Sequence, residues 1–443
     1  MRILYLTHYF PPEGNAPASR AFQLARRWVA DGHSVQVITC APNVPDGVVY
    51  DGYENRPISR ERIEGIDVTR VWTYVAPNQG TVRRIANYLS YMVSASVTGL
   101  FARKSDVMIA TSPQFFAGWA GTIIRKIRRI PFVLEIRDIW PESIAAVGAI
   151  ENPKILSVLE SAERKLYRSS DRIVTVGEGY RDRLLERDVP AGKIDIIPNG
   201  VDTTMFTPRP GDPALRQRWA LEGKFVCSYV GTIGLCAGLE VVLDAATQLK
   251  RQRREDIVFV LVGDGAQRAG LEQRVRQRGL DNVLFTGRQP KQDMPAWLAI
   301  SDACLVHLKR RDVFRSVYPS KIFEAAAMQR PILLGVEGAA EALIRRAGAG
   351  LCFQPESPEQ LITSLLQLVD QPALARTLGQ QGCRHILKHY NHDQLARKYL
   401  QILAAVAGLQ AGVGNRPKAT DPTGTWPGRA GWPTGTREVR RCA

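Results

Sequence analysis

The segment Pro319-Ser320-Lys321-Ile322-Phe323-Glu324 holds the residues of this sequence best suited to bind a charged ligand. The proline predicts a helix start, which puts Lys321 in the first turn and Glu324 one turn later on about the same face. A lysine at this end of a helix opposes the helix dipole, so helix stability does not explain it. A phosphate would be held there by both the dipole and the ammonium group. Glu324 could accept two hydrogen bonds from ribose hydroxyls; a Lys321–Glu324 surface ion pair is the alternative.

Turns that contain glycine follow several predicted strands and could bring backbone N–H groups close to a phosphate. Gly231-Thr232-Ile233-Gly234 and Gly263-Asp264-Gly265 follow two consecutive strands of the second half, and Asn199-Gly200 precedes both. Gly14 lies in a loop that follows the first strand and begins a helix. That loop could equally be a plain turn in which Ser19 caps the helix. A single such turn is common, but several at one sheet edge favour a phosphate site.

Short apolar runs alternate with amphipathic helices along the chain, which is typical of parallel sheets covered on both faces. In the first half the predicted strands are residues 2–6, 34–39, 68–71, 107–110, 132–136, 173–176 and 194–197. In the second half they are residues 225–230, 257–262, 283–286, 303–308, 331–335 and 350–353. Predicted helices include residues 19–30, 239–249, 358–369 and 392–406. The pattern predicts two Rossmann-like, doubly wound α/β domains with a ligand cleft between them at the carboxyl ends of the strands.

The turn Pro198-Asn199-Gly200-Val201-Asp202 separates the two strand series, because it can continue neither a strand nor a helix. We therefore expect an N-terminal domain over residues 1–203 and a C-terminal domain over residues 204–388. A last helix falls within residues 389–407, after the second series is complete. The tail, residues 408–443, is rich in Gly, Pro, Thr and Arg without apolar periodicity, and we expect it to be disordered.

The composition indicates a globular protein with a strong positive charge. Hydrophobic residues make up 45% of the 443, and the formal net charge is +16. No helix-turn-helix, zinc-finger or RNP motif accompanies the charge, so we favour a membrane surface or a phosphate-rich substrate over nucleic acid. The N-terminus does not resemble a secretory signal. The seven cysteines lack ligand-like spacing, so we expect reduced cysteines and no metal site in a cytoplasmic protein.

Basic residues gather in residues 83–129, where eight of them stand against one acidic residue, a net of +7. They flank residues 85–101, an uncharged stretch that is too short and too polar to span a membrane. On a helix, one face would carry Asn87, Ser90, Ser94 and Thr98. The opposite face would carry Ile85, Tyr88, Leu89, Met92, Val93 and Leu100. We expect residues 83–129 to form a patch that docks on an anionic membrane surface; a pair of ordinary domain helices with solvated basic ends is the alternative.

Four motifs make the chain resemble glycosyltransferase family 4, a family of retaining enzymes with the GT-B fold. They are His8-Tyr9-Phe10-Pro11-Pro12, Ile197-Pro198-Asn199-Gly200-Val201-Asp202, Val262-Gly263-Asp264-Gly265, and Pro319-Ser320-Lys321 with Phe323-Glu324-Ala325. The segment Asp138-Ile139-Trp140-Pro141-Glu142-Ser143 is similar to one in the N-acetyl-L-fucosaminyl transferases of O-antigen and capsule assembly. The resemblance implies a GT-B fold whose final helix crosses back to the first domain.

The resemblance also implies roles for single residues. Asp138, Lys321 and Glu324 would be catalytic, with Glu324 on the donor ribose and Lys321 on the diphosphate. The donor would further contact Gly14, Asn199, Gly231, Thr232, Gly263, Asp264, Gly265, Arg288, Lys309 and Ser320. The acceptor would contact His8, Glu13, Asn15, Arg137 and Glu142.

The chain departs from the family pattern at two places. Ser316 stands where many members have the first of two glutamates eight residues apart. Residues 231–238 lack the arginine and lysine with which many members bind the diphosphate. We therefore expect Arg288, Lys309 and Lys321 to meet the diphosphate charge.

These observations predict a retaining glycosyltransferase that moves an N-acetylated hexosamine or deoxyhexosamine from a UDP-sugar to a polyprenyl-diphosphate-linked or glycan acceptor. It would need no metal and no other cofactor. It would work peripherally on the inner face of the plasma membrane, in cell-surface polysaccharide synthesis. A UDP-sugar 2-epimerase of the same architecture, which needs no acceptor, is one alternative. A basic sugar- or nucleic-acid-binding module without activity is another.

Overall fold

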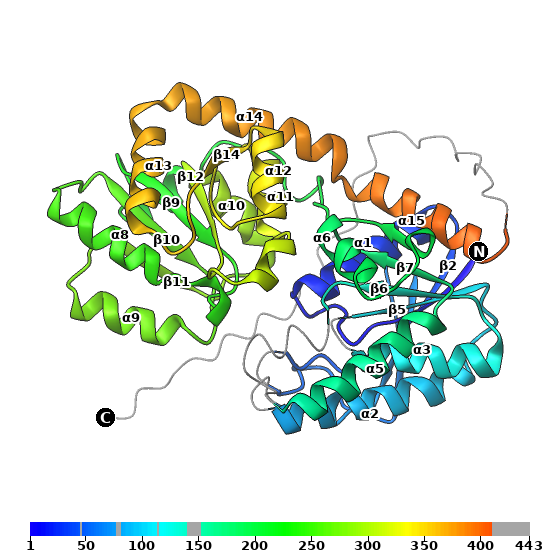
Figure 1. The fold of residues 1–443 in the computed structure, drawn as a ribbon. Coiled ribbons are helices and arrows are strands. Elements are labelled where there is room, and N and C mark those ends of the chain that lie inside the picture. The colour runs from blue at the N-terminus through cyan, green and yellow to red at the C-terminus, as the bar shows by residue number, and fades with distance from the viewer. Residues whose placement is uncertain (45–46, 77–80, 113–114, 140–151, 410–443) are drawn as a thin grey trace, which may run out of the picture. The chain divides into compact units, whose positions relative to one another are not determined.

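The computed structural model describes residues 1–44, 47–76, 81–112, 115–139 and 152–409 (Figure 1). Residues 410–443 of the predicted tail and the segment from Trp140 to Ser143 lie outside these residues. By their internal contacts the residues form two compact units, Met1–Leu134 with the chain from Leu400 onward, and Glu135–Tyr399. The first sheet continues past this division to residue 196, so the boundary predicted after residue 203 lies between the two sheets.

The first sheet has eight strands in the order β3-β4-β2-β1-β5-β6-β7-β8. Their bounds are β1 (Arg2–Leu6), β2 (Ser34–Cys40), β3 (Ile58–Ile63), β4 (Ile66–Val71), β5 (Val107–Thr111), β6 (Phe132–Ile136), β7 (Arg172–Thr175) and β8 (Ile194–Ile196). The pairs β1–β2, β1–β5, β2–β4 and β7–β8 are parallel. Around it lie α1 (Ala16–Ala30), α2 (Thr81–Leu100), α3 (Phe115–Arg128), α5 (Pro153–Ser169) and α6 (Glu178–Leu185).

Strand β3 is the one strand of this sheet that the apolar runs did not predict. It pairs antiparallel with β4 at the sheet edge, through a turn at Glu64 and Gly65 whose φ angles are both positive. That turn geometry suits a two-residue hairpin. The sequence of β3, Ile-Ser-Arg-Glu-Arg-Ile, is polar because an edge strand needs little burial.

The second sheet is parallel and has the order β11-β10-β9-β12-β13-β14. Its strands are β9 (Phe225–Val230), β10 (Ile257–Val262), β11 (Val283–Gly287), β12 (Ala303–His307), β13 (Ile332–Gly335) and β14 (Gly350–Cys352). Its helices are α7 (Pro213–Arg218), α8 (Glu240–Arg251), α9 (Arg268–Gln277), α10 (Met294–Ile300), α11 (Lys321–Ala327), α12 (Ala339–Ala347), α13 (Pro358–Asp370) and α14 (Pro372–His389). The last helix, α15 (His392–Val406), returns to the end of β8 in the first sheet, where Lys398 donates a hydrogen bond of 3.2 Å to the Ile196 carbonyl. This strand order is that of a doubly wound Rossmann sheet, which confirms the predicted fold class.

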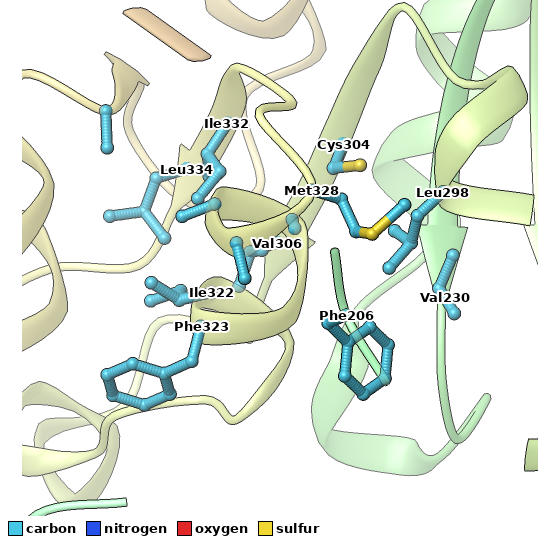
Figure 2. Close-up of a cluster of buried hydrophobic side chains, with 14 of the residues drawn as sticks. Phe206, Val230, Leu298, Cys304, Val306, Ile322, Phe323, Met328, Ile332 and Leu334 are labelled. Carbon is cyan, nitrogen blue, oxygen red and sulfur yellow. The ribbon is translucent and has the colours of Figure 1, made fainter. Parts of the chain in front are cut away.

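Both faces of the second sheet are buried, as its continuous apolar strands require. In β10, Val258, Val260 and Val262 join one hydrophobic cluster, whereas Ile257, Phe259 and Leu261 join another. The alternation follows the two-residue period of a strand. The first cluster includes the side chains that α11 sends inward, among them Phe323 and Met328 (Figure 2).

Helix α11 is buried at almost every position. Its residues Ile322, Phe323 and Ala325 to Ala327 are within the core, as is Met328, the C-cap residue. Lys321 and Glu324 are the two positions of the helix that are only partly buried. Because the other positions of α11 are buried, Lys321 and Glu324, three residues apart, lie on the one side of the helix that is partly exposed.

The close contact between two glycine turns can be tested by substitution. A Cβ atom at Gly263 would lie 2.0 Å from the carbonyl oxygen of Gly231, and φ is +141°. We expect Gly263→Ala to lower the free energy of unfolding by at least about 2 kcal/mol, because backbone must move. Gly270→Ala is the matched control, since its Cβ would meet nothing within 4 Å inside α9. It should stabilise the chain by up to about 1 kcal/mol in urea unfolding. Equal changes in the free energy of unfolding for the two substitutions would contradict the contact between Gly263 and the Gly231 carbonyl.

Candidate functional site

Lys321 contacts the turn that follows β9. Its ammonium nitrogen lies 3.7 Å from the centroid of the Tyr229 ring, in cation–π geometry. The Tyr229 hydroxyl donates a hydrogen bond of 2.7 Å to the carbonyl oxygen of Thr232. A Cβ atom at Gly231 would lie 3.2 Å from the same lysine nitrogen. The structure thus brings together three predicted donor residues, Gly231, Thr232 and Lys321, through Tyr229, which the sequence analysis did not select.

Glu324 lies beside Lys321 without forming an ion pair with it. The ion pairs of the described residues include none between these two side chains. Burial raises the pKa of the Glu324 carboxyl, while the charges of Lys291 and Lys321 act in the opposite direction. The lysine is held by an aromatic ring, so the surface ion pair considered above does not explain the motif. Ser320 is the N-cap residue of α11, but its side chain makes no capping hydrogen bond.

The turns after β9 and β10 are bonded to each other. The Gly231 N–H donates to the Val262 carbonyl at 2.9 Å, and the Ile233 N–H donates to the Asp264 carbonyl at 3.0 Å. A Cβ atom at Gly265 would lie 2.5 Å from the Ile233 carbonyl oxygen. Two adjacent strand ends therefore form one backbone surface, and the fold itself requires the glycines at 231, 263 and 265.

The Asp264 carboxylate lies between two arginines. Arg268 Nη1 is 3.8 Å from Asp264 Oδ1, and Arg288 Nε is 3.9 Å from Asp264 Oδ2. The Gly265 N–H also donates to Oδ1 at 2.8 Å. Asp264 and Arg288 were predicted donor residues, whereas Arg268 was missed. Its position four residues after Asp264 at the start of a helix was the available signal.

Lys309 approaches the far end of the turn after β9. Its backbone N–H donates to the Cys236 carbonyl at 2.9 Å, and a Cβ atom at Gly238 would lie 2.9 Å from its Cγ. Gly238 has a φ of +58°, which favours glycine. Residues 231–238 contain no cationic side chain of their own. Two lysines from other elements contact this turn instead, Lys321 at its start and Lys309 at its end.

His307, at the end of β12, supports the same turn and was missed by the sequence analysis. Its Nδ1 lies 2.7 Å from the Ala237 carbonyl oxygen, and its Nε2 accepts a 2.9 Å hydrogen bond from the Glu356 N–H. This pattern places the proton on Nδ1 of a neutral ring. Burial lowers the pKa of His307 as well. The hydrogen bonds of His307 therefore hold the segment between Gly231 and Gly238 in place.

The predicted residues of the N-terminal loop have structural partners. Asn15, not Ser19, caps α1, because its Oδ1 accepts from the Ala18 N–H at 2.9 Å. The interpretation with Ser19 as the cap is therefore wrong by one turn. A Cβ atom at Gly14 would meet nothing within 4 Å. Packing within the chain therefore does not require a glycine at that position.

Glu13 is buried beneath the loop. Its Oε1 accepts from the N–H groups of Asn43 and Val44 at 3.0 and 3.2 Å. Burial raises the pKa of the Glu13 carboxyl to about 7, although these bonds and the charge of Arg70 oppose the shift. Arg70, which the sequence analysis missed, donates to the Pro11 and Cys40 carbonyls at 2.5 and 2.9 Å.

His8 lies inside an aromatic cluster. Its ring centroid is 4.9 Å from that of Tyr9, 5.7 Å from that of Tyr88 and 4.9 Å from that of Tyr91. Burial lowers the pKa of His8 to about 3, so the ring is neutral over the physiological range. Its carbonyl oxygen accepts from the Thr39 hydroxyl at 3.0 Å. His8 therefore anchors the start of the loop in the core.

The remaining predicted residues follow strands β6 and β8. Arg137 and Asp138 come directly after β6, and Glu142 lies outside the described residues. Burial, with the charge of Asp138, raises the pKa of Tyr180, and Arg137 opposes it. Asn199 precedes Gly200, where a Cβ atom would lie 2.6 Å from the Tyr390 carbonyl oxygen. Packing therefore accounts for the glycine of the Asn-Gly motif.

Among the described residues, no group of three or more His, Cys, Asp or Glu side chains is placed to hold a metal ion. Six cysteines are free in this part of the chain, and the seventh, Cys442, lies outside it.

The sequence matches two families along most of its length. Residues 15–200 match "Glycosyl transferase 4-like domain" and residues 212–385 match "Glycosyl transferases group 1". The fold and these matches define a GT-B glycosyltransferase. The chain belongs to the family 4 glycosyltransferases, as its motifs predicted.

Curated relatives and solved structures agree with this class. The chain is 28% identical, over 89% of its length and 99% of the relative's, to the "Putative colanic acid biosynthesis glycosyl transferase WcaI" of Escherichia coli (strain K12). It is 25% identical, over 56% of its length and 66% of the relative's, to a "GDP-mannose-dependent alpha-(1-6)-phosphatidylinositol monomannoside mannosyltransferase" of Mycobacterium tuberculosis (strain CDC 1551 / Oshkosh). Anabaena HepE, solved in complex with UDP, has the same fold, with a TM-score of 0.68 at 18% identity over 91% of this chain and all of HepE.

Glu13 should make stability depend on pH. Its folded-state pKa of about 7 lies above the ordinary 4.5, so between these values the folded chain holds a proton that the unfolded chain releases. The free energy of unfolding should therefore fall as pH rises through this window, by about 3 kcal/mol relative to Glu13→Gln. Urea unfolding of both proteins at about pH 5 and about pH 8 measures the difference. A difference that is constant with pH would contradict the buried carboxyl.

The Tyr229–Lys321 contact can be measured by a double-mutant cycle. Unfolding of the wild type, Tyr229→Leu, Lys321→Met and the double variant should give a coupling free energy of about 0.5–2 kcal/mol. Tyr229→Phe keeps the ring and loses only the bond to Thr232, so a cycle that pairs it with Lys321→Met should give a coupling free energy near zero. Its own cost should be about 1 kcal/mol. Zero coupling in the Leu cycle would rule out a cation–π contact of consequence.

Proposed function

We propose that the chain is a retaining glycosyltransferase that moves a sugar from a UDP-sugar to a lipid-linked or growing glycan acceptor in cell-surface polysaccharide synthesis. The sugar is an N-acetylated hexosamine or deoxyhexosamine. The observation that carries the proposal is the placement of Lys321 against Tyr229 and Gly231, with Glu324 on the same face of α11. These groups offer a nucleotide-sugar a cation, turn backbone and a carboxylate close to the carboxyl end of β9.

In this proposal the donor lies along the turn after β9. The diphosphate is bound by Lys321 at one end of the turn and Lys309 at the other, with Arg288 from the end of β11. These three cationic side chains take the place of the arginine and lysine that the turn lacks. Glu324 accepts hydrogen bonds from the ribose hydroxyls. Because burial raises the pKa of this partly buried carboxyl, such bonds stabilise its charged form.

The reaction proceeds with retention at the anomeric carbon. The bond between that carbon and the diphosphate oxygen breaks while the acceptor hydroxyl forms its bond from the same face. The acceptor proton passes to the departing diphosphate. Lys321 and Lys309 stabilise the negative charge that develops there, so catalysis consists of positioning and electrostatic stabilisation. We propose that this charge is met without a metal ion, and that Asp138 and Arg137 contact the reacting sugar.

Two names among the relatives support an acceptor that belongs to the cell envelope. One relative is named for colanic acid biosynthesis and another for a phosphatidylinositol mannoside. The second is also named as GDP-mannose-dependent, whereas HepE was solved with UDP. The donor experiment must therefore compare both nucleotides.

The proposal is tested by nucleotide release from UDP-sugars and GDP-mannose, with and without membrane lipid extract, for the wild type and Glu324→Gln. We expect lipid-stimulated release from one UDP-sugar, unchanged by EDTA. Glu324→Gln should lower kcat/KM by about 100-fold, because the carboxylate contributes charged hydrogen bonds. Glu341→Gln on α12, whose carboxylate pairs with Arg345 at 2.8 Å, is the control and should retain activity.

Each other outcome removes a defined part of the proposal. Release from GDP-mannose alone would overturn the UDP assignment, and loss of activity in EDTA would overturn metal independence. Isomerisation of the donor without lipid would favour a 2-epimerase. Salt-dependent DNA binding without any turnover would favour a binding module.

A further inference from the structure

Helix α2 presents a row of apolar side chains to solvent. Its other side is buried through Tyr91 and Ala95, and a Cβ atom at Gly99 would lie 2.3 Å from Ile124 on the neighbouring α3 (Figure 1). The exposed side chains are spaced by four residues and have exposed fractions of 39%, 58%, 53% and 86%: Leu89, Val93, Val97 and Phe101. Residues spaced by four share a helix face, so they form one continuous strip.

Two of the polar side chains that the sequence places on one face of α2, Asn87 and Ser90, hydrogen-bond to the chain after β4. The Asn87 amide donates to the Tyr74 carbonyl at 2.7 Å, and the Ser90 hydroxyl accepts from the Tyr74 N–H at 2.8 Å. These bonds fasten the chain after β4 to α2. Trp72 and Tyr74 are exposed on either side of the buried Thr73. Tyr88, expected on the apolar face, is buried.

Basic groups gather where α2 ends. Arg128 of α3 donates to the carbonyls of Gly99 and Arg103 at 2.8 and 3.1 Å, which brings the ends of the two helices together. Phe101 and the 63% exposed Ile127 lie at these ends. The neighbouring exposed cations are Arg103, which pairs with Asp67 at 2.8 Å, and Lys104, Lys126 and Arg129. The single acidic residue of residues 83–129, Asp106, is paired with Arg2 at 2.5 Å.

We propose that this surface docks on an anionic lipid bilayer, with α2 lying in the membrane interface. The docking surface consists of Leu89, Val93, Val97, Phe101 and Ile127 with Lys104, Lys126 and Arg129. Apolar side chains that enter the headgroup region beside cations that meet lipid phosphates are the combination that interfacial helices use. No helix among the described residues is long and apolar enough to cross a membrane. Lys104, Lys126 and Arg129 have no ion-pair partner among the described residues, and this positive charge selects lipid over a second copy of this basic chain.

The inference extends the proposed function by naming the surface that would bring the enzyme to a lipid-linked acceptor. It can be tested without any nucleotide sugar. Flotation of the full chain with vesicles of phosphatidylcholine and phosphatidylglycerol, compared with phosphatidylcholine alone, should show binding to the anionic vesicles. A failed transferase assay would leave this result intact, and failed flotation would leave the transferase result intact.

Two variants separate the apolar and the basic contributions. Val93→Ser with Val97→Ser and Phe101→Ser should weaken vesicle binding by at least about tenfold, and so should Lys104→Gln with Lys126→Gln. Because these side chains are exposed, circular dichroism and the melting temperature should match the wild type. The controls are Val158→Ser and Lys388→Gln, at exposed positions of α5 and α14, which should bind vesicles like the wild type.

The proposal is overturned if the wild type does not float, or binds both kinds of vesicle equally. It is also overturned if the folded variants bind as tightly as the wild type. Sedimentation of the chain without lipid tests whether a second copy of the chain covers this surface instead. A dimer that the Phe101 variant abolishes, without vesicle binding, would assign the surface to a second copy.

Discussion

The approach of the Gly263 backbone to the Gly231 carbonyl is the constraint on which the candidate site depends. No side chain fits between these two turns, so the ends of β9 and β10 can bond to each other through their backbones. That bonding defines the path of residues 231–234. Because Gly231 has no Cβ, the Lys321 ammonium can lie directly on this path. Tyr229 then fixes both partners, since its ring contacts the lysine and its hydroxyl holds the Thr232 carbonyl.

Burial decides how α11 presents its two charged residues. A seven-residue helix gains little stability from its own hydrogen bonds, so its position must come from packing. Phe323 and Met328 supply that packing in the core of the second sheet (Figure 2). The ammonium at the first turn opposes the helix dipole, and the aromatic ring offsets part of that cost. An anion bound at the same place would gain from both charges.

The buried elements could be predicted from the sequence because burial leaves continuous apolar runs. The bounds of β1, β6, β9, β10 and α15 agree with the predicted ones. Strand β3 could not be found this way, since its edge position leaves it polar. Nor could the contacts of Tyr229, His307 and Arg70, because each joins segments far apart in the chain. The motif residues Gly231, Thr232 and Lys321 were found by type and spacing, whereas the side chains that hold them in place were not.

Helix α2 shows why the periodicity of the sequence alone could not predict which side of a helix is exposed to solvent. An amphipathic pattern divides a helix into polar and apolar sides, and it assumes that polar side chains face water. In α2, Asn87 and Ser90 are instead used to bind the backbone of Tyr74. Tertiary hydrogen bonding turned this polar side toward the protein and left the row from Leu89 to Phe101 exposed. An apolar strip exposed for this reason has no partner among the described residues of the first unit, and the nearby cations define the kind of surface that can cover it.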